Sequence, residues 1–111
     1  MTVEETLASV VVRFNRHLEK TPALAEELRG LRRTVSVRLT DGTSYSVDLT
    51  EGRLAGLRQG AEARADLTIT TDPATFEGLV RKEIGPMKAL VTRRLKIDGS
   101  LEDKLLFRKL L

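Results

Sequence analysis

The chain has 111 residues, contains no cysteine and carries a formal net charge of +3. This length fits one domain, predicted over residues 1–111, that buries about two-thirds of its unfolded surface without disulfides. The absence of cysteine excludes disulfides, thiolate nucleophiles and thiolate metal sites. No apolar run approaches the roughly 20 residues of a membrane span. Glu4 and Glu5 stand where a secretory signal would carry basic residues, so we expect a cytoplasmic protein.

The positive charge is concentrated toward the C-terminus. Residues 1–80 hold 10 Lys and Arg against 12 Asp and Glu, a net charge of −2, whereas residues 81–111 hold 9 against 4, a net charge of +5. Such a segment can attract an anionic membrane surface or ligand, or it can be an ordinary solvated face. Nucleic acid is disfavoured because the one Tyr and three Phe do not cluster with Lys or Arg as a stacking platform.

Two helices are predicted at the N-terminus. Within residues 2–19, apolar residues recur at the spacing of one helical face. They are Val3, Leu7, Val10, Val11, Phe14 and Leu18. Thr21 is expected to cap a second, short helix, because Pro22 suits the first helical position and Gly30 can end the helix.

A hairpin follows these helices. Residues 35–39 and 45–49 alternate apolar and polar side chains on either side of Asp41-Gly42. This arrangement predicts two antiparallel strands with one face in the core and the other in water. The face expected to be solvated includes Ser36, Arg38, Ser46 and Asp48.

Three further strands and three helices complete the predicted chain. The strands are expected around residues 53–60, 67–70 and 95–97. Asp72-Pro73 is typical of a helix start, and Gly85-Pro86 should end that helix after Ile84 and begin a shorter one.

The last helix begins with a capping box, in which the Ser100 side chain caps the helix and Asp103 returns the hydrogen bond. Together these elements predict a two-layer α+β domain, with a mostly antiparallel sheet and helices over its apolar face.

No catalytic or metal-binding pattern is present. The single histidine, His17, lies on a helix beside Phe14, and no second histidine or any cysteine is available to share a metal ion. The serines stand in no nucleophile motif, and the glycines match no phosphate-binding loop. An enzyme would need polar groups converging in a pocket, for which only Tyr45 and Glu83 are candidates. We therefore predict no catalysis, no cofactor and no metal.

Apolar residues are in excess in the last 36 residues of the chain. The final helix alone has them at positions 101, 105, 106, 107, 110 and 111, a stripe wider than one packing seam needs. Such an excess can form ordinary core, line a cavity or make a dimer face, and the pattern does not distinguish these three.

The stretch DLTITTDPATFEGLV…IGPMKALVTRRLKIDGS, with the LTDGTSYSVDL hairpin before it, resembles the sterol carrier protein 2 family of lipid carriers. The resemblance runs from about Val35 to the C-terminus. It implies a five-stranded, mostly antiparallel sheet covered on one face by about five helices, with an apolar tunnel between the layers. It also implies non-catalytic binding and transfer of lipids such as fatty acids, fatty acyl-CoA, sterols or isoprenoid-like molecules.

The resemblance places apolar side chains of the C-terminal elements in the tunnel wall, with the helix after Gly85-Pro86 as a movable cover at its mouth. The implied lipid-binding residues are Phe76, Leu79, Val80, Ile84, Met87, Leu90, Val91, Leu95, Ile97, Leu101, Leu105 and Leu106. Three basic residues could contact a headgroup or an anionic membrane, or simply decorate the surface. They are Lys88, Arg93 and Arg94.

The chain departs from the family in two places. Arg93-Arg94 precedes Leu95 where family members often carry glycine, and the chain ends in RKLL, not in a peroxisomal Ser-Lys-Leu signal. The second departure favours the cytoplasm. As an alternative to lipid carriage, the same apolar helices could make an accessory or dimerisation module that docks to an enzyme. A monomer or weak homodimer is expected.

Overall fold

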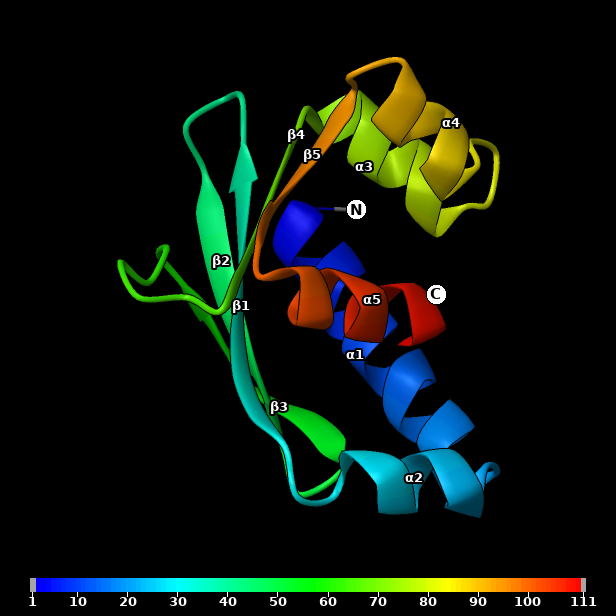
Figure 1. The fold of residues 1–111 in the computed structure, drawn as a ribbon. Helices are drawn as coiled ribbons and strands as arrows, with labels where there is room; N and C mark the ends of the chain where they lie inside the picture. Colours follow the sequence, from blue (N-terminus) through cyan, green and yellow to red (C-terminus); the bar gives the residue numbers. More distant parts are fainter. Residues whose placement is uncertain (1, 111) are drawn as a thin grey trace.

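The computed structural model describes residues 2–110, with side chains as far as Leu106, and forms two layers (Figure 1). The order of helices and strands is the predicted one. In chain order they are α1 (Val3–Glu19), α2 (Pro22–Leu28), β1 (Arg32–Leu39), β2 (Ser44–Thr50), β3 (Arg53–Gln59), β4 (Leu67–Thr71), α3 (Pro73–Val80), α4 (Pro86–Val91), β5 (Leu95–Gly99) and α5 (Leu101–Leu110).

The five strands form one sheet in the order β3-β2-β1-β4-β5. The central pair β1–β4 is parallel, and the other three pairs are antiparallel. The helices lie on one side of the sheet, with α2 across its lower end in Figure 1. The prediction of a mostly antiparallel sheet covered on one face is therefore confirmed.

The predicted hairpin joins β1 and β2. Gly42 adopts a φ of +94°, a conformation that side chains other than glycine rarely take. The amide of Thr43 donates to the Asp41 carboxylate at 3.0 Å, and the amide of Leu39 donates to the Thr43 carbonyl at 2.9 Å. This turn sets a register that brings Val35 opposite Val47, so apolar side chains of both strands share one face.

The outer face of the sheet is less solvated than predicted. Ser36 and Ser46 are fully buried, and their hydroxyl oxygens lie 2.9 Å apart. The connection between β3 and β4 covers them: the Glu62 amide donates to Ser36, and Ser46 donates to the Gly60 carbonyl. The alternation placed both serines on the correct face, but it carried no information about a loop that folds back over that face.

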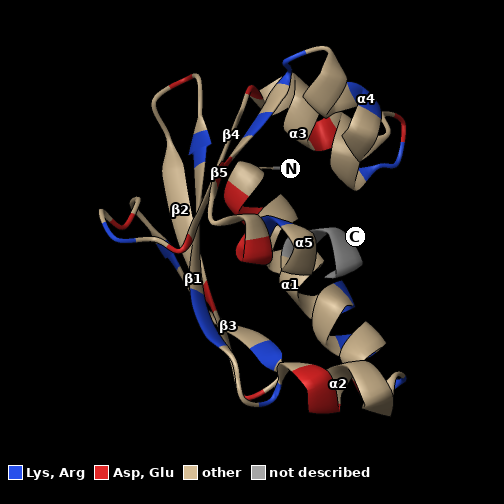
Figure 2. Ribbon diagram, viewed as in Figure 1, with Lys and Arg blue, Asp and Glu red and all other residues tan. Residues whose placement is uncertain are grey.

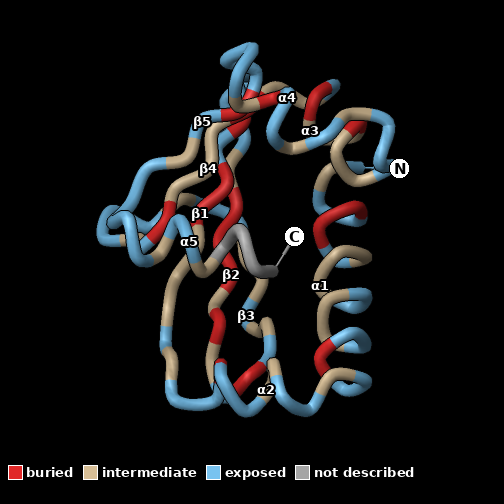
Figure 3. Tube along the Cα trace, turned by 45° about the vertical axis from the view of Figure 1, so that its right-hand side comes forward, coloured by how far each residue is buried: buried red, intermediate tan, exposed pale blue. Residues whose placement is uncertain are grey.

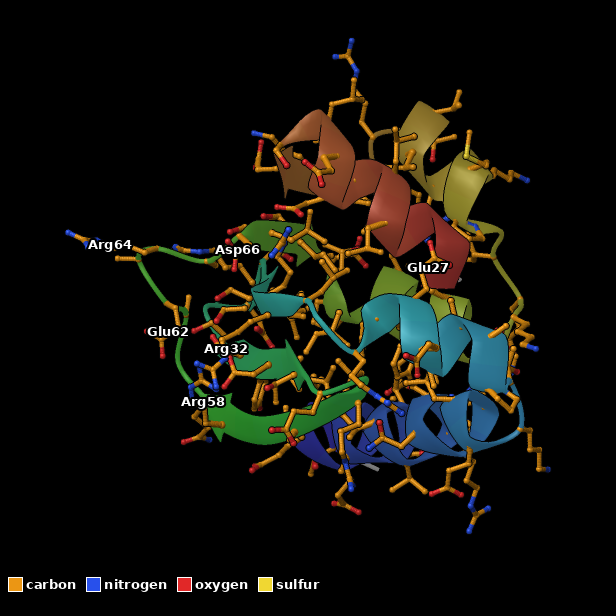
Figure 4. The ribbon with its side chains drawn as sticks, turned by 60° about the horizontal axis from the view of Figure 1, so that its bottom comes forward. Glu27, Arg32, Arg58, Glu62, Arg64 and Asp66 are labelled. Atoms are coloured by element: carbon orange, nitrogen blue, oxygen red, sulfur yellow. The ribbon has the colours of Figure 1, made fainter. Side chains whose placement is uncertain are left out.

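Figure 4 shows the side chains of that connection. Arg58 lies next to Glu62, and their ion pair measures 3.1 Å. Arg64 points away from the body of the molecule, whereas Asp66 lies close to the sheet. The connection is thus tied down at the β3 end, and Asp66 is placed at the start of β4.

Buried apolar residues form two clusters. Figure 3 colours the buried positions red, and they follow the strands and the side of α1 that faces the sheet. One cluster is centred on Leu7, Val37, Leu39 and Tyr45. The other is centred on Leu18, Leu28 and Leu49.

Two of the three predicted side-chain caps form. The Asp72 carboxylate accepts from the Thr75 amide at 2.7 Å, and the Ser100 hydroxyl accepts from the Asp103 amide at 3.0 Å. The Thr21 prediction was wrong: Thr21 occupies the N-cap position of α2, but its side chain makes no capping hydrogen bond. The reciprocal half of the capping box was also wrong, because the Asp103 carboxylate binds Arg33 instead.

The α3 helix ends earlier than predicted, at Val80 instead of at the Gly85-Pro86 break. Lys82 then adopts a φ of +61°, which turns the chain back. The turn presses Ile84 against Gly78, where an added Cβ would lie 2.5 Å from the Ile84 Cδ1 atom. Close packing on a glycine thus ends α3, and Gly85-Pro86 serves only to start α4.

Candidate functional site

A cavity of about 230 Å³ lies between α1 and the sheet. Its wall is apolar except for three charged residues. The apolar lining residues are Leu7, Val10, Val11, Phe14, Val35, Val37, Val47, Leu49, Leu54, Leu57, Leu67, Ile69, Phe76 and Leu106. Because members of both core clusters belong to this wall, the cavity is an unfilled part of the core.

Helix α1 makes one wall of the cavity with a single apolar face. Leu7, Val10, Val11 and Phe14 follow at intervals of three, one and three residues, so they share the side that faces the sheet. Asn15, the next residue, fastens this helix to β3. Its side-chain amide donates to the Leu54 carbonyl at 3.0 Å, and its oxygen accepts from the Leu54 amide at 2.8 Å.

The floor of the cavity is made by the inward side chains of the sheet. In β1, β2 and β4 these side chains are at alternate positions, as a pleated strand requires. They are Val35, Val37, Val47, Leu49, Leu67 and Ile69. β-branched residues predominate among them, and such side chains are stiff, so the sheet offers a firm floor.

The three charged lining residues are Arg33, Asp66 and Asp103, from β1, from the start of β4 and from α5. The Arg33 Nε donates to Asp103 Oδ1 at 2.8 Å, and the Asp66 Oδ2 accepts from the Thr34 amide at 2.7 Å. The hydrogen bond to Asp103 raises the pKa of Arg33 above its usual value, and the charges of Asp66 and Glu102 add to that effect. The polar end of the cavity therefore holds one ion pair, Arg33–Asp103, and one carboxylate, Asp66, that is bound to a backbone amide.

Helix α5 covers part of the cavity and contributes Leu106 to its wall. Leu101 is 73% exposed and Leu105 is 51% exposed, so these two apolar residues of α5 face outward. The ion pair Arg33–Asp103 joins α5 to β1, and its side chains are only 28% and 14% exposed. The remaining predicted stripe of this helix, from residue 107 onward, lies outside the described side chains.

Of the twelve predicted lipid-binding residues, the structure brings Phe76 and Leu106 to the cavity. Leu79, Val80 and Ile84 are partly buried in and after α3. Val80 lines a separate polar groove between α1 and α3, together with Thr6, Ser9, Arg13, Glu77, Arg81 and Lys82.

The other predicted residues lie farther along the chain. In α4, Met87 and Val91 are 60% and 78% exposed, and Leu90 is partly buried. In β5, Leu95 is buried and Ile97 is partly buried. None of these five lines the cavity, so their contact with a lipid stays a prediction.

The predicted headgroup residues lie around α4, where Figure 2 shows a concentration of Lys and Arg. Lys88, Arg93 and Arg94 are all exposed. The Arg94 Nε also donates to the buried Thr75 hydroxyl at 3.1 Å, so this arginine links the start of β5 to α3. Their contact with a headgroup or membrane stays a prediction as well.

The sequence interpretation missed the α1 and sheet residues of the wall. A signal for them was present, because Val10, Val11, Val35 and Val37 had already been placed on apolar faces. What was missing was a reason to place the empty space beneath α1 and not beneath α4.

Among the described residues, no group of three or more His, Cys, Asp or Glu side chains is arranged to hold a metal ion. No helix in residues 2–110 is long and apolar enough to cross a membrane.

Comparison with known proteins identifies the family. The model of the SCP-2 sterol transfer family matches residues 14–111. A comparison with curated protein sequences gives no match. Among solved structures, palmitated SCP2L2 from Aedes aegypti is similar with a TM-score of 0.66 and 21% identity, over 95% of this chain and 91% of that one.

Two other solved structures are similar in fold. A protein described as UbiJ-SCP2, a ubiquinone synthesis protein, gives a TM-score of 0.63 with 19% identity, over 99% of this chain and 92% of its own. The sec-alkylsulfatase Pisa1 from Pseudomonas sp. gives a TM-score of 0.62 with 21% identity. That match covers 78% of this chain but only 14% of the sulfatase, so the chain corresponds to a small part of that enzyme.

Proposed function

We propose that this chain, which belongs to the SCP-2 sterol transfer family, carries one lipid molecule non-catalytically in the cytoplasm, with the lipid chain held between α1 and the sheet. Lipid binding and transfer is the general function that the family membership supports. The single observation that supports the proposed location is the apolar cavity, whose wall is polar at one end only.

The physical basis of binding is the removal of a hydrocarbon chain from water. Each buried methylene contributes about 0.8 kcal/mol, so ten of them contribute roughly 8 kcal/mol before the costs of association. This contribution depends more on the number of methylenes buried than on the shape of the lipid. Fatty acyl, sterol-like and isoprenoid-like chains therefore all belong to the proposed ligand range.

The cavity must widen to accept a long chain. Its volume of about 230 Å³ is below the roughly 300 to 1,000 Å³ of typical small-molecule pockets. The sheet floor and the Asn15-anchored helix are poorly suited to move. Helix α5, which covers part of the cavity, is better suited to move. We propose that α4 moves toward the opened cavity as well, which would bring the predicted residues Met87, Leu90 and Val91 to a guest.

Two adjacent valines of α1 allow a matched test. Val11 lines the cavity, whereas Val12 is 50% exposed and does not. A Val11→Trp substitution should fill the cavity and weaken binding of a fluorescent long-chain alcohol by at least about 10-fold. Val12→Trp should leave binding unchanged. Equal binding by the two variants, with both shown to be folded by circular dichroism, would show that the chain binds elsewhere.

We further propose that the exposed apolar residues of α4 and α5 rest on an anionic membrane during lipid transfer. Met87 and Val91 lie four residues apart on α4, and Lys88 lies between them in sequence. Exposed apolar side chains beside basic ones suit the interface of an anionic bilayer.

The membrane contact can be tested with vesicles of phosphatidylcholine, with and without phosphatidylserine. The double substitution Lys88→Gln/Val91→Ser should reduce sedimentation with anionic vesicles, and Val12→Ser/Arg13→Gln on α1 is the control. If α4 instead mediates docking between proteins, light scattering should show a dimer that the α4 substitutions dissociate. That result would favour the accessory or dimerisation module.

A further inference from the structure

The charges at the polar end of the cavity are unbalanced. Among the described residues of the wall, Arg33 is the only cation, and Asp103 and Asp66 supply two carboxylates. The exposed Glu102, just outside the wall, adds a third negative charge near Arg33. Counted over these described residues, one positive charge against three negative charges gives a net charge of −2. Glu102 and Asp103 are the acidic residues of the first turn of α5, which Figure 2 colours red.

Two N–H groups of Arg33 already donate to protein acceptors. Its Nε donates to Asp103 at 2.8 Å, and its NH1 nitrogen donates to the Arg32 carbonyl at 2.9 Å. The Arg33 and Asp103 side chains are mostly buried, so solvent screens their interactions less than it screens those of surface charges. A second anion at this end would have to share the single guanidinium charge with Asp103.

We propose that the cavity selects lipids with an uncharged hydroxyl head, such as long-chain alcohols, sterols or phenols, over lipids with a carboxylate or phosphate head. This selection rests on the proposed function, because it concerns the same cavity.

Hydrogen-bonding capacity explains the selection. A hydroxyl group both donates and accepts, so it can donate to an Asp66 or Asp103 oxygen and accept from a remaining Arg33 N–H group. A carboxylate only accepts, and it brings a further negative charge to a site whose described residues hold one cation and an excess of carboxylates. The headgroup should lie at this end because the rest of the wall is apolar.

The experiment compares two ligands with the same chain. Binding of 1-decanol and of decanoate to the whole protein is measured by calorimetry at pH 8 and 0.1 M salt. We expect decanol to bind at least about 10-fold more tightly than decanoate. Raising the salt concentration should narrow the ratio, because salt screens the repulsion of the carboxylate.

Charge-removing substitutions identify the residues responsible. Asp66→Asn/Glu102→Gln removes two carboxylates and keeps the Arg33–Asp103 pair, so decanoate affinity should rise about three- to ten-fold. Decanol affinity should change less than about two-fold, because an amide oxygen at position 66 and the Asp103 carboxylate can still accept from its hydroxyl. Glu19→Gln/Glu83→Gln removes the same charge from exposed positions outside the wall and should change neither affinity.

Three results would contradict the selection. Wild-type protein that binds decanoate as tightly as decanol would overturn the inference alone, since chain binding would then be intact. An Asp66→Asn/Glu102→Gln variant with no gain in decanoate affinity would overturn the role of these carboxylates. Binding of neither ligand would contradict the proposed function of the cavity, and the inference with it.

Discussion

The first and last helices both cover the cavity, but they are attached to the sheet in different ways. Helix α1 buries Leu7 and Leu18 to 7% and 3% exposure and holds both backbone groups of Leu54 through Asn15. Helix α5 leaves Leu101 and Leu105 largely exposed and is joined to β1 by the Arg33–Asp103 ion pair.

The difference indicates where the cavity should open. Segments with few buried apolar contacts open at a lower free energy than segments packed into the core. Helix α1 should therefore stay in place while α5 moves to admit a guest. The two ends of the chain would then have separate tasks, one structural and the other concerned with access.

The largest effect on stability is expected from a core residue of α1 that lies outside the cavity wall. Leu18 packs with Leu28 and Leu49, so Leu18→Ala should lower the free energy of unfolding by about 2 to 5 kcal/mol. Leu105→Ala, an equal truncation on the exposed side of α5, should change it by less than about 0.5 kcal/mol. Urea denaturation measures the unfolding free energy of both variants. Similar losses of stability in the two would mean that α1 and α5 are held equally firmly.

A smaller loss is expected from the polar anchor of α1. Asn15→Ala leaves the amide and carbonyl of partly buried Leu54 without their partner, at a cost of about 1 to 3 kcal/mol. The neighbouring exposed residue provides the control, because Arg16→Ala should have almost no effect on the urea midpoint. An Asn15→Ala protein as stable as the control would mean that packing alone fixes α1.

The α3 helix, which contributes Phe76 to the cavity, depends on a charged cap. The Thr75 hydroxyl and amide both donate to Asp72 and hold the pKa of that carboxyl below its usual value. Asp72→Ala should therefore cost about 1 kcal/mol at pH 7.

The pH dependence of this cost follows from the lowered pKa. The ionised carboxylate is favoured in the folded state, so its contribution is complete above the ordinary carboxyl pKa of about 3.9 and is lost as the pH falls through the folded value. Thermal unfolding of both proteins from pH 7 to pH 2 should show the difference in stability shrinking. If the difference in stability between wild type and Asp72→Ala does not change with pH, the substitution acts through helix propensity and not through the ionised carboxylate.

The smallest effect on global stability, and the most local one, is expected at the ion pair of α5. Asp103→Asn should cost at most about 1 kcal/mol globally, yet it should speed amide hydrogen exchange within residues 101–106 several-fold and leave α1 unchanged. Asp98→Asn, which breaks the exposed pair with Lys96 at 3.9 Å, is the control. Exchange that is equally slow in both variants would mean that Leu106, and not the ion pair, holds α5.

Much of the fold could be predicted because its signals are local. Asp41-Gly42 between alternating strands, Asp72 before Pro73 and Ser100 before Asp103 each act within a few residues. Periodicity likewise identified the inner face of α1. The end of α3 was misplaced because it depends on Ile84 packing against Gly78, a contact that no local propensity describes.

The site was predicted less well than the fold. The resemblance to a lipid-carrier family led to the C-terminal helices, and the structure brings Phe76 and Leu106 from them to the cavity. Most of the wall comes from α1 and from the inner face of the sheet. Apolar periodicity identifies these faces equally well whether the space between them is filled or empty.

Local sequence thus determined the helices, the strands, their caps and which side chains face inward, since these depend on neighbours a few residues apart. Tertiary structure alone decided where the cavity lies and which charges meet at its end. Arg33 and Asp103 are 70 residues apart in sequence. The α1 and β4 side chains that line the cavity are also far apart in sequence. Only the packing of the two layers brings such groups together or leaves space between them.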